Sequence, residues 1–275
     1  MKSIAVLLTC HNRRNKTLAC LCSFYNAIHP ENFLFEIFLV DDGSTDGTSE
    51  AIKEKFPQIN IIEGNGNLFW NRGMHLAWKT AKGNKAYDYY LWLNDDVLIR
   101  SNGLTTIIND AKEKPESIIC GAMQSAITKT SITYGGKNKE GKLIKPTGKP
   151  TPCMFINGNM VLIPNNIVTS IDILDPFYPH AIGDYEYGLR ASKAGYQCYV
   201  SSDFTGFCEN NPSLPKWCLC NVNFLDRLKS LYSPLGNSHP FYFFIYEYKY
   251  HGLFVALKHY ITIHLRVFCP KFWKI

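Results

Sequence analysis

The chain has 275 residues, of which 46% are hydrophobic and 19% are charged. This composition excludes a disordered chain and suits one large α/β domain, alone or with a small appendage. Its 29 Lys and Arg residues and 23 Asp and Glu residues leave a formal net charge of +6, which suits a phosphate-bearing ligand or an anionic membrane surface. No dense stripe of basic and aromatic residues precedes the last third of the chain, so we expect no nucleic-acid partner.

The ten cysteines predict free thiols in a reducing cytoplasm. They form two Cys-x-Cys pairs, Cys20/Cys22 and Cys218/Cys220, and otherwise lie scattered, unlike the paired Cys-x-x-Cys motifs of zinc sites. The N-terminal apolar run is too short for a signal peptide, and no apolar run reaches the roughly 18–20 residues that span a bilayer. We therefore expect a cytoplasmic protein.

Short apolar strands alternate with helices in the first 121 residues. Strands are expected at 3–9, 35–40, 60–62, 89–93 and 118–121, and helices at 13–28, 45–56, 74–81 and 104–113. This alternation predicts a mostly parallel sheet with helices on both faces. Further along, we expect a loop or strand pair at 128–152, a strand with a glycine break at 154–164, and a helix at 184–195.

Polar clusters follow three of the predicted strands, at 9–12, 41–44 and 94–96. Ligands of parallel sheets bind beyond these strand ends, so the clusters predict a site. Adjacent carboxylates such as Asp95 and Asp96 repel each other and favour Mg²⁺ or Mn²⁺, although a simple turn is the alternative. Asp41 and Asp42 indicate either a strand-to-helix turn or a carboxylate that binds a nucleobase or ribose.

The glycine-rich segment 64–73 separates a strand from a helix. It is not a dinucleotide fingerprint, because Phe69 stands where the third glycine belongs, which argues against a Rossmann oxidoreductase. Arg72 is either a phosphate partner or an ordinary surface arginine. Asp184 opens a helix, where it serves as an N-cap, as a general base aimed into the crevice, or as both.

Five segments in order resemble glycosyltransferase family 2: 9–12 (TCHN), 40–48 (VDDGSTDGT), 67–73 (NLFWNRG), 93–97 (LNDDV) and 183–190 (GDYEYGLR). The resemblance covers residues 1–210. It implies a GT-A fold, which is a Rossmann-like α/β architecture. It also implies a nucleotide-diphosphate sugar donor, inversion at the anomeric carbon, and Mn²⁺ or Mg²⁺ as cofactor.

The same resemblance implies roles for matching residues. Asp184 corresponds to the catalytic base. Asp96 and Asn94 correspond to metal ligands, with Asn94 in place of the first Asp of the Asp-x-Asp motif. The residues implied to bind or enclose the donor are Thr9, Asn12, Asp41, Asp42, Asn67, Trp70, Arg72, Gly73, Asp95, Asn157, Gly158, Asn159 and Glu186. The chain departs from the family where Gly183 replaces a frequent Glu, and where 205–210 lacks the histidine that many relatives carry near the metal.

Residues 211–275 predict a helical extension rich in aromatic and basic side chains. The segment 241–275 holds twelve Phe, Tyr or Trp residues together with Lys249, Lys258, Arg266, Lys271 and Lys274. We expect it either to pack on domain 1–210 or to contact the inner face of the plasma membrane peripherally. The second alternative suits a lipid-linked rather than a free saccharide acceptor.

The sequence therefore predicts an inverting, metal-dependent glycosyltransferase of polysaccharide biosynthesis, such as that of capsule or O-antigen. One alternative is a sugar-phosphate nucleotidyltransferase, which needs a glycine-rich basic loop after the first strand, where this chain has Cys-His-Asn-Arg-Arg at 10–14. The other is a non-catalytic module that binds nucleotide sugars, against which Asp96 and Asp184 argue.

Overall fold

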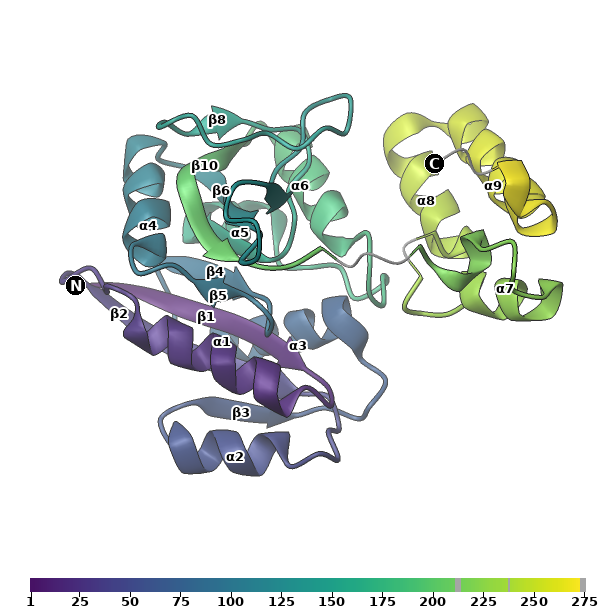
Figure 1. Cartoon of the computed structure of the whole chain (residues 1–275). Helices are drawn as coiled ribbons and strands as arrows, with labels where there is room; N and C mark the ends of the chain where they lie inside the picture. The colour runs from purple at the N-terminus through teal and green to yellow at the C-terminus, as the bar shows by residue number, and fades with distance from the viewer. Residues whose placement is uncertain (211–213, 237, 273–275) are drawn as a thin grey trace.

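The computed structural model describes residues 1–210, 214–236 and 238–272, and consists of an α/β domain followed by a helical extension (Figure 1). The strands are β1 (Lys2–Cys10), β2 (Phe33–Asp41), β3 (Asn60–Glu63), β4 (Tyr89–Leu93), β5 (Leu98–Ile99), β6 (Ser117–Gln124), β7 (Ile132–Tyr134), β8 (Thr151–Pro152), β9 (Met160–Pro164) and β10 (Gln197–Phe207). The α-helices are α1 (Arg14–Asn26), α2 (Thr48–Lys55), α3 (Phe69–Asn84), α4 (Gly103–Glu113), α5 (Asn165–Ile171), α6 (Gly183–Lys193), α7 (Phe224–Leu231), α8 (Pro240–His251) and α9 (Leu253–Phe268).

One sheet runs through the domain in the order β3-β2-β1-β4-β9-β6-β10-β5, with β7 beside β6 and β8 beside β10. The pairs β3–β2, β2–β1, β1–β4 and β6–β10 are parallel. Strand β9 runs antiparallel between β4 and β6 and joins the two parallel halves. The predicted mostly parallel sheet is confirmed, but only 160–164 of the expected 154–164 strand is extended in the sheet.

Helices cover both faces of the sheet, as predicted. Strand β1 alternates between the two cores: Ile4, Val6 and Leu8 pack toward α1, α2 and α4, whereas Ala5 and Leu7 pack toward α3, α5 and α6. All five side chains are fully buried. Burial on both faces explains why this strand reads as an unbroken apolar run.

Helix α3 begins at Phe69, five residues before the predicted start at 74, so Trp70 and Arg72 stand on its first turn rather than in a loop. The helix crosses β1 in close contact, because a Cβ atom on Gly73 would lie 2.3 Å from the Thr9 hydroxyl oxygen. The glycine thus fixes how closely the helix approaches the first strand. Helix propensity along the sequence does not indicate this contact between α3 and β1.

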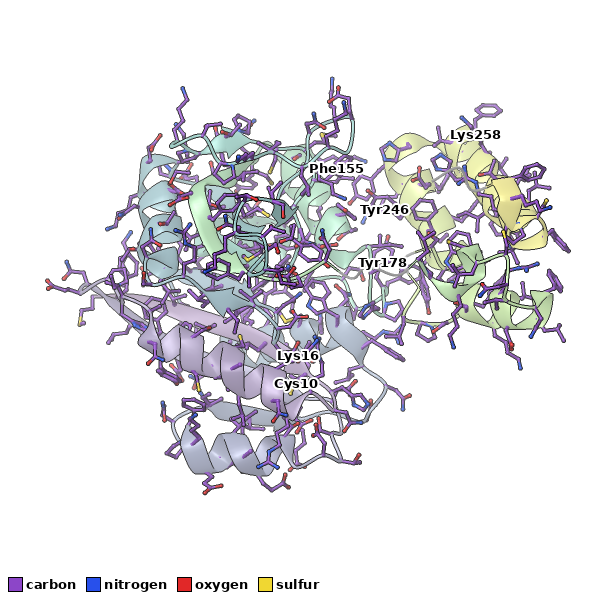
Figure 2. All side chains as sticks on the ribbon, viewed as in Figure 1. Cys10, Lys16, Phe155, Tyr178, Tyr246 and Lys258 are labelled. Atoms are coloured by element: carbon purple, nitrogen blue, oxygen red, sulfur yellow. The ribbon has the colours of Figure 1, made fainter. Side chains whose placement is uncertain are left out.

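The extension after residue 214 has a small core of its own, formed by Trp217, Cys218, Leu231, Ile263 and Val267. It meets the α/β domain through an aromatic cluster in which Tyr246 of α8 packs with Tyr178. Figure 2 labels both tyrosines at this junction, and Lys258 on the extension. Among the described residues, no helix combines the length and apolarity needed to cross a bilayer.

Candidate active site

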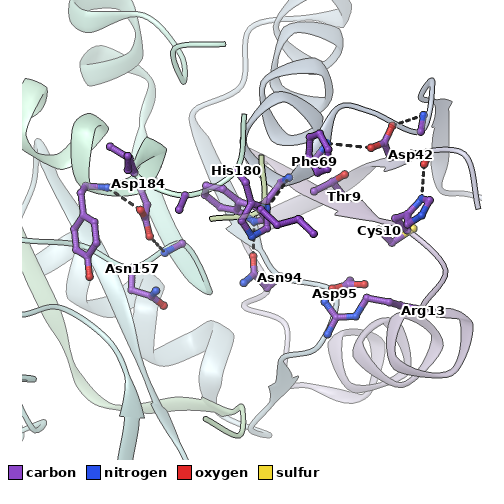
Figure 3. A pocket seen from close by; sticks show the side chains of 18 residues that line it. Thr9, Cys10, Arg13, Asp42, Phe69, Asn94, Asp95, Asn157, His180 and Asp184 are labelled. Carbon is purple, nitrogen blue, oxygen red and sulfur yellow. Dashed lines mark hydrogen bonds and ion pairs between the residues drawn. The ribbon is translucent and has the colours of Figure 1, made fainter. Parts of the chain in front are cut away.

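A cavity of about 620 Å³ opens at the carboxyl ends of β1 and β4 (Figure 3). Asp184 and Asp42 lie toward opposite sides of it, and Asn94 and Asp95 lie between them. The residues predicted from the sequence that line the cavity are Thr9, Asp42, Trp70, Asn94, Asp95, Asn157, Gly158 and Asp184. Segments more than 170 residues apart in the chain therefore meet around one space.

The acidic turn after β2 organises one side of the cavity. The Asp42 carboxylate accepts hydrogen bonds from the backbone amides of Gly66 (2.8 Å), Leu68 (2.8 Å) and Phe69 (3.0 Å). The Asp41 carboxylate accepts from the Ser44 amide at 2.9 Å within its own turn. These contacts hold the glycine-rich loop against the end of β2.

The end of β1 is tied to the same turn by polar side chains. Asn12, in the left-handed region with φ 51°, accepts from the Thr45 amide at 2.7 Å. His11, which also lines the cavity, contacts the Asp42 carbonyl oxygen through Nδ1 at 2.6 Å. Asn67, by contrast, is exposed, and its backbone amide donates a hydrogen bond to Asn65 Oδ1.

Arg13 bridges the two carboxylates that follow β4. Its Nη1 lies 2.9 Å from Asp95 Oδ1 and its Nη2 lies 2.6 Å from Asp96 Oδ2. Asp95 is only 4% exposed, and burial raises its pKa to about 6 although Arg13 acts in the opposite direction. Arg13 was not among the site residues predicted from the sequence. Its position directly after the 9–12 cluster could have indicated that it lies at the site.

The surroundings of Asp96 contain a thiol from the 205–210 segment, which lacks the histidine expected from the family resemblance. Cys208 Sγ lies 3.8 Å from Asp96 Oδ1, and burial together with the Asp96 charge raises the pKa of this thiol to about 12. The thiol donates a hydrogen bond to this carboxylate, and a soft sulfur ligand suits Mg²⁺ or Mn²⁺ less well than oxygen does. Across residues 1–210, 214–236 and 238–272, no group of three or more His, Cys, Asp or Glu residues is arranged to hold an ion.

Asn94 links the floor of the cavity to α3. Its Oδ1 accepts from Trp70 Nε1 at 2.7 Å, and its Nδ2 donates to Asn159 Oδ1 at 2.6 Å. A Cβ atom on Gly158 would lie 2.4 Å from the Trp70 ring, so the glycine lets the indole lie against the loop. Both ends of the Asn94 amide are thus already engaged within the protein.

Asp184 lies in the first turn of α6, two residues after the N-cap position, which Ile182 occupies. Its Oδ2 accepts from the Gly158 amide at 3.0 Å and its Oδ1 from the Tyr185 amide at 2.8 Å. The N-cap interpretation is wrong, because Asp184 stands inside the helix and Ile182 takes the N-cap position without a side-chain capping bond. Burial raises the pKa of Asp184, and the two amides partly oppose that effect.

The departure at position 183 has a steric reason. A Cβ atom on Gly183 would lie 1.9 Å from Asn71 Oδ1 on α3. Asn71 is fully buried and donates through Nδ2 to the carbonyl oxygens of Asp175 (2.7 Å) and Tyr178 (2.6 Å). No side chain fits between α6 and this residue.

Two residues predicted to contact the donor are engaged elsewhere. Arg72 donates to the Pro176 carbonyl oxygen at 2.9 Å rather than turning toward the cavity. Glu186 is fully buried and pairs with Arg190 at 3.0 Å and with Lys249 of the extension at 2.7 Å. Packing of the 175–179 segment and of α8 determines where these two side chains point.

Comparison with known proteins assigns the family. The model of glycosyl transferase family 2 matches residues 5–167, more than half of the chain. The chain belongs to glycosyl transferase family 2. This assignment covers the acidic turn, the glycine-rich loop, the Asn94–Asp96 cluster and the Asn157–Asn159 loop, and it argues against the nucleotidyltransferase alternative.

Curated relatives of this family-2 chain resemble it over part of their length. A poly-beta-1,6-N-acetyl-D-glucosamine synthase of Staphylococcus epidermidis is 28% identical over 123 residues, which are 42% of this chain and 27% of that protein. The chain therefore matches only about a quarter of that relative.

Solved structures confirm the GT-A fold. S. aureus TarS 1–349 superposes with a TM-score of 0.58 at 14% identity, covering 96% of this chain and 81% of TarS 1–349. The mannosyltransferase PcManGT from Pyrobaculum calidifontis, in complex with GDP-Man and Mn²⁺, superposes with a TM-score of 0.59 at 13% identity, covering 97% and 75% of the two chains.

Proposed function

We propose that this family-2 glycosyltransferase moves a sugar from a nucleotide-diphosphate donor to a hydroxyl group of a saccharide acceptor, with inversion, in polysaccharide biosynthesis. The observation that carries the proposal is the cavity shared by Asp42, Asp95 and Asp184. The relative that synthesises poly-beta-1,6-N-acetyl-D-glucosamine supports a polysaccharide product. Complexes of TarS 1–349 with UDP-GlcNAc and of PcManGT with GDP-Man support a nucleotide-sugar donor.

The donor is proposed to run along the cavity in a defined direction. The nucleoside occupies the side formed by Thr9, His11 and Asp42, and the diphosphate lies near Arg13 and Asp95. The transferred sugar then reaches toward the 157–158 loop. In this arrangement the positive guanidinium is close to the leaving phosphate, where it stabilises developing negative charge.

A divalent cation, Mn²⁺ or Mg²⁺, is proposed at the β4 carboxylates. Adjacent carboxylate oxygens fit such an ion, which takes its remaining ligands from water and substrate phosphates. Asp96 is the preferred ligand, because its side chain is 28% exposed whereas that of Asp95 is only 5% exposed. Asn94 is reassigned from ligand to positioning residue, since its Oδ1 already accepts from Trp70. When bound, the ion neutralises charge on the departing diphosphate.

Asp184 is proposed as the general base. Its two backbone hydrogen bonds, from Gly158 and Tyr185, fix the carboxylate at the wall of the cavity. As the acceptor hydroxyl attacks the anomeric carbon, the carboxylate removes the hydroxyl proton and the bond to the nucleotide diphosphate breaks. Burial raises the pKa of Asp184, and a stronger base takes a hydroxyl proton more readily.

Asp184→Asn tests the proposal, with Asp172→Asn as the matched control on an exposed carboxylate. Thermal shift is measured with UDP, GDP, dTDP and CDP sugars, with and without Mn²⁺, and transfer is measured with the donor that binds. We expect Asp184→Asn to keep metal-dependent donor binding and lose transfer. Near-normal turnover would remove Asp184 as the base. Donor binding by the unmodified chain without transfer or hydrolysis of any donor would support the binding-module alternative.

A peripheral contact of the extension with an anionic membrane surface is a second part of the proposal. Helix α9 exposes an apolar stripe with spacings of three or four residues, formed by Phe254, Leu257, Ile261, Leu265 and Phe268. Residues 1–210 hold as many basic as acidic residues, so the whole net charge of +6 belongs to the extension. Apolar anchors combined with positive charge are typical of helices that lie on anionic bilayers, and they suit a lipid-linked acceptor.

Vesicle sedimentation tests this contact. The full chain is mixed with vesicles of phosphatidylcholine alone or of phosphatidylcholine with phosphatidylglycerol. We expect binding to the anionic vesicles and loss of that binding with Phe254→Ser and Ile261→Ser together. Ile127→Ser, at an exposed apolar residue outside the extension, should cause no loss. Equal sedimentation of the stripe variant and the unmodified chain would refute the contact.

A further inference from the structure

A second cavity, of about 520 Å³, adjoins the first on the far side of Asn157. It lies between the segment around β7 and the N-terminal turn of α6. Asn157 and Tyr185 line both cavities and therefore form a shared wall. Asp184 immediately precedes Tyr185 in the same turn, so the proposed base stands where the two cavities meet.

Lys137 presents a positive charge to this second cavity. Its Nζ donates to Tyr185 Oη at 3.0 Å and lies 5.6 Å from the centre of the tyrosine ring. Within the described part of the chain, no carboxylate comes within 4 Å of this ammonium group, although the side chain is half-buried. A cation held partly out of water with no carboxylate in direct contact is a ready partner for an anionic ligand.

The backbone around Lys137 is fixed in place. Its amide donates to the Phe155 carbonyl oxygen at 2.8 Å, and its carbonyl oxygen accepts from the Met154 amide at 2.8 Å. On the preceding residue, Gly136, a Cβ atom would lie 2.7 Å from Cys153 Sγ, so the two segments pack in direct contact. The ammonium group is thus presented from a paired backbone rather than from a free loop.

The charge of the surrounding segment has the same sign. Residues 137–149 contain five lysines and a single acidic residue, Glu140. The Lys137 charge also acts on Asp184, whose pKa it helps to lower against the dominant effect of burial. An anion bound beside Lys137 would offset this influence and bring its own neighbouring hydroxyl group close to the base.

We infer that the second cavity receives the acceptor, and that this acceptor carries an anionic group, a carboxylate or a phosphate, which pairs with Lys137 while its sugar or polyol portion packs on Tyr185. This inference rests on the proposed function, because it assigns the acceptor of that same reaction. It narrows the acceptor to an acidic saccharide or a phosphate-bearing polymer. A uronate supplies the carboxylate in the first case and a phosphodiester the phosphate in the second.

Saturation-transfer NMR with small probes tests the inference without any transfer reaction. The probes are two matched pairs, glucuronate with glucose and glycerol 3-phosphate with glycerol. We expect the anionic member of at least one pair to bind more tightly than its neutral twin, and the pair that responds tells a carboxylate from a phosphate acceptor. Lys137→Met should weaken that binding by about tenfold or more, Lys137→Arg should restore it, and Lys142→Met on the same segment should leave it unchanged.

Equal binding of anionic and neutral probes to the unmodified chain would overturn the inference even if Lys137→Met failed to fold. So would a folded Lys137→Met variant that binds the anion as tightly as the unmodified chain. Donor-dependent thermal shift, measured on the same samples, reports the proposed function separately. A chain that binds the anion through Lys137 but binds no nucleotide sugar would refute the proposed reaction and keep the anion site.

Discussion

Replacing Glu186 with Gln should loosen the attachment of the extension rather than donor binding. Glu186 is fully buried, and its carboxylate accepts hydrogen bonds from Lys249 Nζ at 2.7 Å and from Tyr250 Oη at 2.8 Å, both on α8. It also pairs with Arg190 on its own helix at 3.0 Å. The substitution keeps the shape of the side chain but leaves both cations without a counter-charge.

The size of the expected loss in stability depends on how far Glu186 and its two cationic partners are buried. Removing one partner of a buried ion pair costs about 3–5 kcal/mol. Lys249 is 43% exposed and Arg190 is 22% exposed, so water solvates part of the charge that is left behind. We therefore expect Glu186→Gln to lower the free energy of unfolding by about 2–3 kcal/mol. Lys249→Met, which removes the more exposed partner, should cost about 1 kcal/mol.

The effect should depend on pH in a definite direction. Burial would raise the pKa of Glu186, but Arg190, Lys249 and Tyr250 outweigh burial and hold that pKa below its usual range. A carboxylate with a lowered folded-state pKa stabilises the protein above its unfolded-state pKa, and this stabilisation is lost as the pH falls through the folded-state value. The stability difference between the unmodified chain and Glu186→Gln should therefore shrink below about pH 4.

Urea unfolding, together with limited proteolysis of the extension, measures this prediction. We expect a lower midpoint and faster cleavage for Glu186→Gln, with donor-dependent thermal shift retained. Unchanged stability combined with lost donor binding would refute the anchoring role. That result would instead support the role implied by the family resemblance, in which Glu186 contacts the donor.

Two further predictions concern the cavity. Because burial raises the pKa of Asp184 above the ordinary value of 3.8, the acidic limb of the pH profile of kcat/KM should lie above that value, and a limb at or below it would contradict the assignment of the base. Gly183→Ala, which sets a Cβ atom 1.9 Å from Asn71 Oδ1, should lower stability by about 1–3 kcal/mol in thermal melts. Gly83→Ala, with no atom within 4 Å of the added Cβ, should be neutral or stabilising, and equal losses for the two variants would refute the steric argument.

The part of the site that follows strand ends could be predicted from the sequence. Thr9, Asp42 and Asp95 sit at or just beyond apolar runs, and parallel strands bring their carboxyl ends to one edge of the sheet. Local pattern and topology together are enough to bring such residues near each other. For the same reason, predicted and observed strands differ mainly at their ends.

Side chains whose direction depends on distant packing could not be predicted in this way. Arg72 and Arg13 both looked like arginines beside a polar cluster, yet only Arg13 reaches the carboxylates after β4. Arg72 instead donates a hydrogen bond to the carbonyl oxygen of Pro176, which lies more than 100 residues away in the chain. Helix α3 likewise begins earlier than periodicity indicates, because Gly73 allows contact with β1.

The first turn of α6 shows how one short segment joins the parts of the molecule. Successive side chains of a helix point about 100° apart, so three consecutive residues contact three different parts of the molecule. Asp184 lines the first cavity, Tyr185 forms the wall toward the second, and Glu186 is bound by α8 of the extension. Any shift of the extension that moves Lys249 must therefore act on a helical turn that also carries the proposed base. If α9 rests on a membrane, docking there and the position of Asp184 are coupled through less than one turn of helix.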